Sequence, residues 1–436
     1  MKQSEFKKRR KQLMQRIGQG NIALISSAPM RTRNRDVRYP FRQDSDFYYL
    51  TGFNEPDAVA VFIPGREKGQ YILFCQEFDE KRAVWEGAHA GLEGATKIYD
   101  ADDAFPIDDL DDILPGMMEN KTKVFYPMGR SSDLDHSLLE WINHIKSHSR
   151  SGAVAPGELI SLDHILSEMR LFKSPAELKL MRQAAEVSAG GHVRAMQKCK
   201  PGLYEYQIEA ELTHHFMLHG LRYTAYPSIV AGGKNACVLH YTDNNDKLKN
   251  GDLLLIDAGA ECDHYAADIT RTFPVSGRFS EPQKILYQLV LDAQTAAIEQ
   301  VKPGNSWQAP HDAAVEVLTR GLVDLGLLKG KVKKLIKEEK YKAFYMHRTG
   351  HWLGMDVHDV GDYKVDQEWR VLEPGMVLTV EPGLYIPEHC KQVDEKWRGI
   401  GIRIEDDVLV TPQGHEVLTS GVPKTIVEIE TLMQAG

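Results

Sequence analysis

Acidic residues inside apolar, strand-like segments place the strongest constraint on how this chain can fold. Asp257 ends the apolar run LLLID, and Glu381 and Glu405 lie in the segments GMVLTVEPGLY and GIRIEDDVLV. Asp268 follows the polar turn after the first of these runs. A buried carboxylate is costly unless its charge is paired or coordinates a cation. These four acidic residues therefore predict a shared cation-binding site.

Three histidines within twelve residues could line the same pocket, namely His347, His351 and His358. A single histidine is usually a structural residue, whereas three in so short a segment indicate a polar pocket. Arg403 lies two residues before Glu405, so both side chains point to the same face of a strand.

The kinds of ligand favour two divalent metal ions. Four carboxylates supply four negative charges, which match two divalent cations, and one neutral imidazole completes the set. Oxygen-rich ligation with one nitrogen suits manganese, iron or cobalt better than a structural zinc site. A pair of such ions, about 3.5–4 Å apart, can hold a hydroxide and polarise a carbonyl, which is the chemistry of a hydrolase.

The chain of 436 residues is long enough for two domains. In residues 1–172, strand-like segments alternate with helical patterns such as 5–17, which predicts an α/β domain. Residues 174–177 read SPAE, a capping box with proline at the first helical position, so a long helix is expected to open a second domain over 173–436. The remaining expected elements are strands at 21–28, 58–64, 71–75, 253–260, 265–273, 376–381, 400–405 and 407–411, and helices near 204–219, 281–300 and 308–327.

Charge and composition exclude several classes of protein. The net charge of −9 argues against a nucleic-acid partner. No apolar run reaches the roughly 18 residues of a membrane helix, and the basic N-terminus lacks the apolar core of a secretory signal. Five scattered cysteines without a CxxC pair favour a reducing, cytoplasmic location. Phosphate-loop, GxGxxG, GxSxG and HExxH motifs are absent from the sequence.

The sequence resembles the pita-bread metallopeptidases, and aminopeptidase P in particular. Their five metal ligands are matched, in order, by Asp257, Asp268, His351, Glu381 and Glu405. Three further segments resemble aminopeptidase P, namely FRQDSDFYYLTGFNEPDAV (41–59), KSPAELKLMRQAA (173–185) and GHWLGMDVHDVG (350–361). The resemblance covers nearly the whole chain. It implies a smaller N-terminal α/β domain and a C-terminal pita-bread α/β domain with two divalent ions, usually Mn(II).

The resemblance also implies a role for each ligand. Asp257 would bind one ion, Asp268 and Glu405 would bridge both, and His351 and Glu381 would complete the other. Glu381 would also act as the general base.

Further residues would assist these ligands. His240 and His358 match histidines that contact substrate, and His347 is a further pocket candidate. Tyr385 and Arg403 match a supporting pair in which the arginine holds a ligand carboxylate.

The implied reaction is removal of the N-terminal residue from peptides with proline in second position. The Xaa-Pro bond lacks an N–H and restricts the preceding residue, so a dedicated enzyme is reasonable. Prolidase, which cleaves Xaa-Pro dipeptides with the same ligands, is the nearest alternative. A non-enzymatic binding module and creatinase share the fold but lack this ligand set, and both are disfavoured.

The resemblance further implies a homo-oligomer, either a dimer or a tetramer. Trp85 lies in the segment AVWEGAHAG, which is expected to be a loop. Its side chain would either line a subunit interface or be partly buried in the core.

Overall fold

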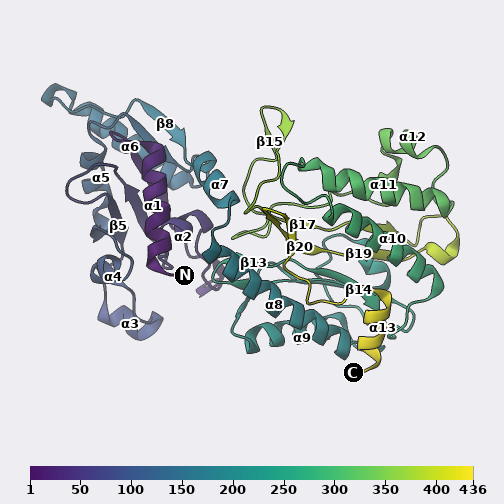
Figure 1. The fold of residues 1–436 in the computed structure, drawn as a ribbon. Coiled ribbons are helices and arrows are strands. Elements are labelled where there is room, and N and C mark those ends of the chain that lie inside the picture. The colour runs from purple at the N-terminus through teal and green to yellow at the C-terminus, as the bar shows by residue number, and fades with distance from the viewer. Residues whose placement is uncertain (436) are drawn as a thin grey trace. The chain divides into compact units, whose positions relative to one another are not determined.

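The computed structural model describes residues 1–435 and divides into two compact units (Figure 1). The first spans residues 1–169, and the second begins at Arg170. Each unit combines helices with β-sheet, so the predicted α/β class is confirmed. Within residues 1–435, no helix combines the length and the hydropathy that crossing a membrane requires.

The first unit is built on a six-stranded sheet in the order β6-β5-β4-β1-β7-β8. These strands are β1 (Ile22–Ser26), β4 (Val59–Phe62), β5 (Tyr71–Cys75), β6 (Asp103–Pro106), β7 (Lys123–Tyr126) and β8 (Glu158–Ser161). Strand β4 pairs antiparallel with β1 and β5, and the outer pairs are parallel. The sequences VAVF and YILFC are buried along their whole length. On one face of the sheet, Val59, Val61, Ile72 and Phe74 pack with apolar side chains of α5 and α6.

The unit also contains helices and a short hairpin, which pairs β2 (Thr32–Asn34) with β3 (Val37–Arg38). The helices are α1 (Gln3–Ile17), α2 (Ser45–Thr51), α3 (Glu80–Glu86), α4 (Gly91–Lys97), α5 (Leu110–Met118), α6 (Ser132–Ser147) and α7 (Asp163–Leu171). Trp85 lies in α3, so the prediction of a loop is wrong. Asp79 caps this helix by accepting from the Lys81 N–H, a local signal that the Gly/Ala-rich composition obscured.

In the second unit, the helices form two packed pairs on either side of the strands (Figure 1). They are α8 (Pro175–Lys198) with α9 (Glu205–Leu218), and α10 (Glu281–Ile298) with α11 (Gln308–Asp324); α12 (Val332–Lys337) and α13 (Ile426–Gln434) complete the set. The capping box predicted for the first of these is present. The Glu177 N–H donates to Ser174 Oγ at 3.4 Å, and the Ser174 N–H donates to Glu177 Oε2 at 2.8 Å.

Between the helix pairs, two long β-hairpins each pass from one small sheet into another. The first bent hairpin consists of β11 (Leu253–Asp257), β12 (Ala260–Cys262), β13 (Tyr265–Ala266) and β14 (Thr270–Pro274). Its base, β11 and β14, pairs with β10 (Ile229–Gly232), whereas its tip, β12 and β13, pairs with β9 (Tyr223–Thr224).

The second bent hairpin has the same plan. It consists of β17 (Val377–Val380), β18 (Gly383–Ile386), β19 (Ile400–Arg403) and β20 (Asp406–Thr411). Its base, β17 and β20, pairs with β21 (Gly414–Val417), and its tip is the pair β18–β19. A short hairpin of β15 (Lys364–Val365) and β16 (Glu368–Trp369) precedes it.

The bends correct the strand boundaries predicted from the sequence. Continuous strands were expected over 253–260, 265–273 and 400–405, but each is interrupted where the hairpin changes sheets. At the first bend the two arms approach so closely that a Cβ at Gly259 would lie 1.7 Å from the Ala267 carbonyl oxygen. Only glycine fits this crossing, and the apolar pattern of the arms does not reveal it.

Candidate metal centre

The two bends supply all four acidic residues identified in the sequence. Asp257 ends β11, and Asp268 lies just before β14 on the other arm of the first bent hairpin. Glu381 directly follows β17, and Glu405 lies between β19 and β20 of the second. Each arm can therefore present a carboxylate at its bend.

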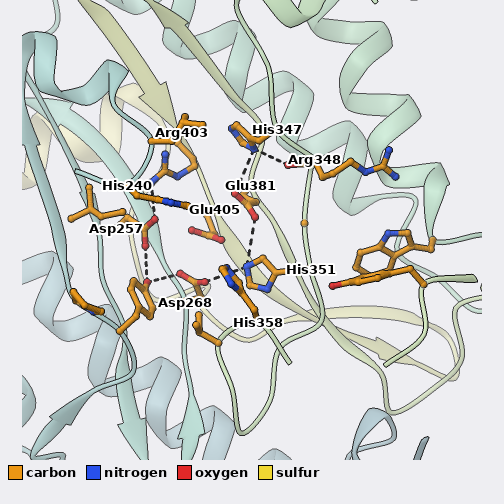
Figure 2. A pocket seen from close by; sticks show the side chains of 18 of the residues that line it. His240, Asp257, Asp268, His347, Arg348, His351, His358, Glu381, Arg403 and Glu405 are labelled. Carbon is orange, nitrogen blue, oxygen red and sulfur yellow. Dashed lines mark hydrogen bonds and ion pairs between the residues drawn. The ribbon is translucent and has the colours of Figure 1, made fainter. Parts of the chain in front are cut away.

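Two of these carboxylates and one histidine lie within reach of a single ion. Ligand atoms of Asp268, His351 and Glu405 all lie within 4.8 Å of one another. His351 Nε2 is 3.5 Å from Asp268 Oδ2 and 3.6 Å from Glu381 Oε1. The Tyr226 hydroxyl connects the remaining carboxylate, because it lies 2.7 Å from Asp257 Oδ1 and 2.5 Å from Asp268 Oδ1 (Figure 2).

A cavity of about 810 Å³ opens onto this cluster. Its lining includes every metal-ligand and catalytic candidate predicted from the sequence: His240, Asp257, Asp268, His347, His351, His358, Glu381, Arg403 and Glu405. The structure therefore gathers into one site side chains that come from distant segments of the second unit.

The orientation of His351 suits a metal ligand. Its Nδ1 lies 3.0 Å from the Trp352 carbonyl oxygen, which can only accept, so Nδ1 carries the proton. In the neutral ring, Nε2 is therefore the nitrogen available to a metal ion, and it points toward Asp268 and Glu381. A histidine held through one nitrogen in this way is the usual arrangement in metal sites.

Arg403 supports the cluster from one side. Its Nη2 donates to Asp257 Oδ2 at 2.6 Å, Nη1 donates to the Tyr385 hydroxyl at 3.1 Å, and Nε donates to Thr270 Oγ1 at 3.1 Å. Thr270 in turn donates to Glu405 Oε2 at 2.5 Å. One guanidinium thus fixes two carboxylates, the first directly and the second through Thr270.

Both ring nitrogens of His347 are engaged by the protein. Nδ1 donates to the Arg348 carbonyl oxygen at 2.7 Å, so Nε2 accepts from the Tyr385 hydroxyl at 2.8 Å. Burial lowers the pKa of His347 to about 3, and the charge of Arg403 adds to this effect. In this arrangement His347 is a neutral ring that holds Tyr385 and forms part of the cavity wall.

His240 and His358 differ from His347 because their exposed imidazoles face the cavity (Figure 2). The ring of His358 lies 4.5 Å from that of His351, edge to face. The loop that carries it is anchored by the next residue. Asp359 accepts from Lys173 Nζ at 3.0 Å and from Arg170 Nη2 at 2.5 Å, in a fully buried cluster.

The electrostatics of the cluster favour positive charge. Burial raises the pKa of Glu381 to about 7, and burial together with repulsion from Asp268 raises the pKa of Glu405 well above its usual value. Burial alone would lower the pKa of His351, but its hydrogen bond with Asp268 and the charge of Glu381 raise it to about 9. The protein alone therefore retains protons among these ligands. Divalent cations would displace these protons, so the donor set fits two metal ions.

Sequence reasoning missed three residues that position the ligands. Tyr226 joins Asp257 to Asp268, and Thr270 joins Arg403 to Glu405. Asp407, also unidentified, accepts from the Asp268 N–H at 3.1 Å through Oδ2. No spacing rule links these residues to their partners, because each contact depends on how the two bent hairpins meet. The only feature of the local sequence that could have identified one of them is the pair of aspartates, Asp406 and Asp407, that follows Glu405.

Known proteins resemble this chain over nearly its whole length. The model of metallopeptidase family M24 matches residues 179–412, and the model of the aminopeptidase P N-terminal domain matches residues 6–126. The Xaa-Pro aminopeptidase of Haemophilus influenzae is 46% identical over 429 residues, which cover 98% of this chain and 97% of the relative.

Solved structures agree. Pseudomonas aeruginosa aminopeptidase PepP has a TM-score of 0.99 and 58% identity, with 100% of this chain and 98% of that chain covered. A zinc-substituted Escherichia coli aminopeptidase P in complex with product has a TM-score of 0.97 and 43% identity, with 100% and 99% covered.

Proposed function

This chain belongs to metallopeptidase family M24 and carries the N-terminal domain of aminopeptidase P, and we propose that it removes the N-terminal residue from peptides whose second residue is proline. It is a metalloexopeptidase by family. The observation that carries the proposal is the meeting of four carboxylates from two bent hairpins with Nε2 of His351 in one cavity.

Two divalent metal ions would be held by Asp257, Asp268, His351, Glu381 and Glu405. By the resemblance to aminopeptidase P, Asp268 and Glu405 would serve both ions, Asp257 would hold one, and His351 with Glu381 would hold the other. When bound, the ions supply Lewis acidity for the scissile carbonyl and make water nucleophilic at neutral pH. We propose manganese because the resemblance to aminopeptidase P implies it; the oxygen-rich ligand set suits manganese, iron or cobalt.

Glu381 acts as the general base and then as the general acid. Its carboxylate takes the proton from the attacking water and returns it to the proline nitrogen, which leaves as a secondary amine. Arg403 keeps Asp257 oriented, and Thr270 does the same for Glu405.

His240 and His358 bind the reacting carbonyl. Both imidazoles face the cavity, where an N–H can donate to the oxygen as negative charge develops. Aromatic side chains, including Tyr363 and Trp307, form another part of the lining and offer a flat apolar surface for the pyrrolidine ring. Because the Xaa-Pro nitrogen carries no hydrogen, the site needs no acceptor for it.

The activity is tested by incubating the purified protein, loaded with Mn(II), with Arg-Pro-Pro and with Arg-Pro. Release of arginine from the tripeptide supports the aminopeptidase, whereas cleavage of the dipeptide alone would indicate a prolidase. No cleavage of either would contradict the proposal. Metal analysis of protein purified without added metal identifies the ion that is bound.

Assembly and location complete the proposal. We infer a homo-oligomer, either a dimer or a tetramer, because Val84 and Trp85 on α3 are 83% and 88% exposed in the single chain. We assign the protein to the cytoplasm because all five cysteines are free thiols, which a reducing compartment preserves.

A further inference from the structure

Two basic side chains meet on one tryptophan at the cavity. The Arg348 Cζ lies 5.0 Å from the ring centroid of Trp369, and Lys364 Nζ lies 4.6 Å from it. All three residues line the cavity that contains the metal-ligand candidates. The indole attracts each cation through its ring face, so one aromatic side chain holds both.

The tryptophan has a fixed support. It lies in β16, directly opposite Lys364 of β15. The hairpin is anchored at its base, where the Trp307 N–H donates to the Arg370 carbonyl oxygen at 2.8 Å and the Arg370 N–H donates to the Tyr363 carbonyl oxygen at 3.0 Å. Lys364 and Trp369 are therefore carried by a braced hairpin, and Arg348 reaches the indole from a separate segment.

Neither cation is neutralised by the protein. Arg348 donates to the neutral side-chain amide of Gln308, whose own N–H₂ is bound to Asp312. Across residues 1–435, no carboxylate forms an ion pair with Arg348 or Lys364. Two unpaired positive charges in a chain of net charge −9 form a local site for an anion.

The cavity therefore has two electrostatically opposite regions. The metal-ligand carboxylates lie in one, and the Arg348 side chain extends away from them (Figure 2). A short peptide has the matching polarity, with an α-amino group at one end and an α-carboxylate at the other. In an aminopeptidase substrate only one residue precedes the cleaved bond. The rest of the peptide must therefore extend away from the catalytic carboxylates.

We propose that Arg348 and Lys364, braced on Trp369, bind a carboxylate that lies downstream of the substrate's proline. The carboxylate is either the C-terminus of a short peptide or an aspartate or glutamate side chain of a longer one. This inference rests on the proposed function and deepens it, because it assigns a preference among Xaa-Pro substrates.

The test compares kcat/KM for Ala-Pro-Ala as the free acid and as the C-terminal amide. A second arm uses amidated pentapeptides Ala-Pro-Ala-Glu-Gly and Ala-Pro-Ala-Gln-Gly, which separates side-chain from C-terminal carboxylates. The proteins are the Mn(II)-loaded wild type, Arg348→Gln, Lys364→Gln and the double variant. Lys340→Gln is the matched control, because that lysine is exposed but does not line the cavity.

We expect the wild type to favour one or both carboxylate substrates by about tenfold. The ratio of kcat/KM for a carboxylate peptide to that for its neutral counterpart should fall by about threefold in each single variant. In the double variant the preference should disappear, whereas Lys340→Gln should leave the ratio unchanged. The wild-type ratio should also fall as salt rises from 50 to 500 mM.

A wild-type enzyme without carboxylate preference, or a double variant that keeps the preference, would overturn the inference. Failure of the wild type to cleave any of the four peptides would instead overturn the proposed function. The metal content and the thermal unfolding curve of each variant are also measured. They show whether a lost carboxylate preference results from removal of Arg348 or Lys364 or from a damaged fold.

Discussion

Arg403 Nη2 lies 2.6 Å from Asp257 Oδ2, and this contact places a permanent positive charge against one of the four clustered carboxylates. The other oxygen of Asp257 accepts from Tyr226 at 2.7 Å. Asp257 is therefore held at both oxygens by the protein. Asp268 Oδ1 lies 2.5 Å from the same Tyr226 hydroxyl, and Glu405 Oε2 accepts from Thr270. Among the described residues, neither carboxylate has a basic partner as close as Arg403 is to Asp257.

Replacement of Arg403 should therefore weaken metal binding. We expect Arg403→Ala to lower metal affinity by about 10- to 100-fold, because Asp257 loses the group that orients it. Titration of the metal-free protein with Mn(II) in a calorimeter measures the change. Arg182→Ala, which removes an exposed pair with Glu416, is the control. Wild-type affinity in Arg403→Ala would show that the contact does not orient the ligand.

Asp268→Asn and Glu405→Gln should abolish turnover and leave the fold intact. Each keeps the side-chain volume but removes a charge assigned to both metal ions. We expect the bound metal to fall below two ions per chain while the circular dichroism spectrum stays that of the wild type. Full activity in either variant would contradict a dinuclear mechanism.

His358→Ala should keep its metal and lose rate. If its imidazole donates to the developing oxyanion, its removal lowers kcat by about 10²–10³. His351→Ala should lose metal instead, and His389→Ala, which does not line the cavity, should change neither quantity. Equal metal loss in the His358 and His351 variants would show that the two roles are wrongly assigned.

The stability of the second unit should fall at acid pH because of His192. Burial lowers the pKa of this histidine to about 4, and its Nε2 lies 2.9 Å from the Ala258 carbonyl oxygen. In the unfolded chain the imidazole titrates at its ordinary pKa of about 6.5, so between these values the unfolded state binds more protons. This contribution is complete above about pH 6.5, and about 3 kcal/mol of it is lost as pH falls to about 4.

The measurement is the free energy of unfolding in urea at pH 7, 5 and 4, with a chelator present so that metal loss does not contribute. His192→Gln retains an N–H donor for the carbonyl but cannot titrate. Its loss of stability on acidification should be smaller than that of the wild type. Equal losses would refute the assignment.

Trp85→Ala should disrupt assembly. With 88% of its surface exposed in the single chain, this indole is available to a second copy. Light scattering after size exclusion should give a lower mass for the variant, with metal content unchanged. Leu139→Ala replaces another exposed apolar side chain of the same unit, 53% exposed, and should have no effect. A wild-type protein that is already monomeric would contradict the homo-oligomer.

The identity of the clustered acids could be read from the sequence because burial of charge is a strong physical constraint. Asp257, Glu381 and Glu405 stand out against apolar neighbours, and the structure brings them together with Asp268. The strand breaks at these residues could not be predicted. The alternation of inward and outward side chains that marks a strand continues through each bend. Only the neighbouring strands to which the hairpin is hydrogen-bonded show that it has passed from one sheet into another.

The hydrogen bonds that hold the metal-ligand carboxylates in place could not be predicted from the sequence either. Tyr226 reaches Asp268 across 42 positions, and Thr270 reaches Glu405 across 135. Such contacts depend on tertiary packing, which local spacing does not encode. Trp85 illustrates the opposite error, because a composition typical of a loop was overridden by a capped helical turn.

The two bent hairpins also determine what metal binding does to the chain. The ligands lie on both hairpins, and helices α10 and α11 lie between these hairpins in the sequence. An ion shared by Asp268 and Glu405 would thus tie the chain into a closed loop, as a removable crosslink does. Closing a loop of this length lowers the entropy of the open chain. Bound metal would therefore stabilise the second unit against unfolding. Proteases should cut the segment between the two hairpins faster once the ions are removed.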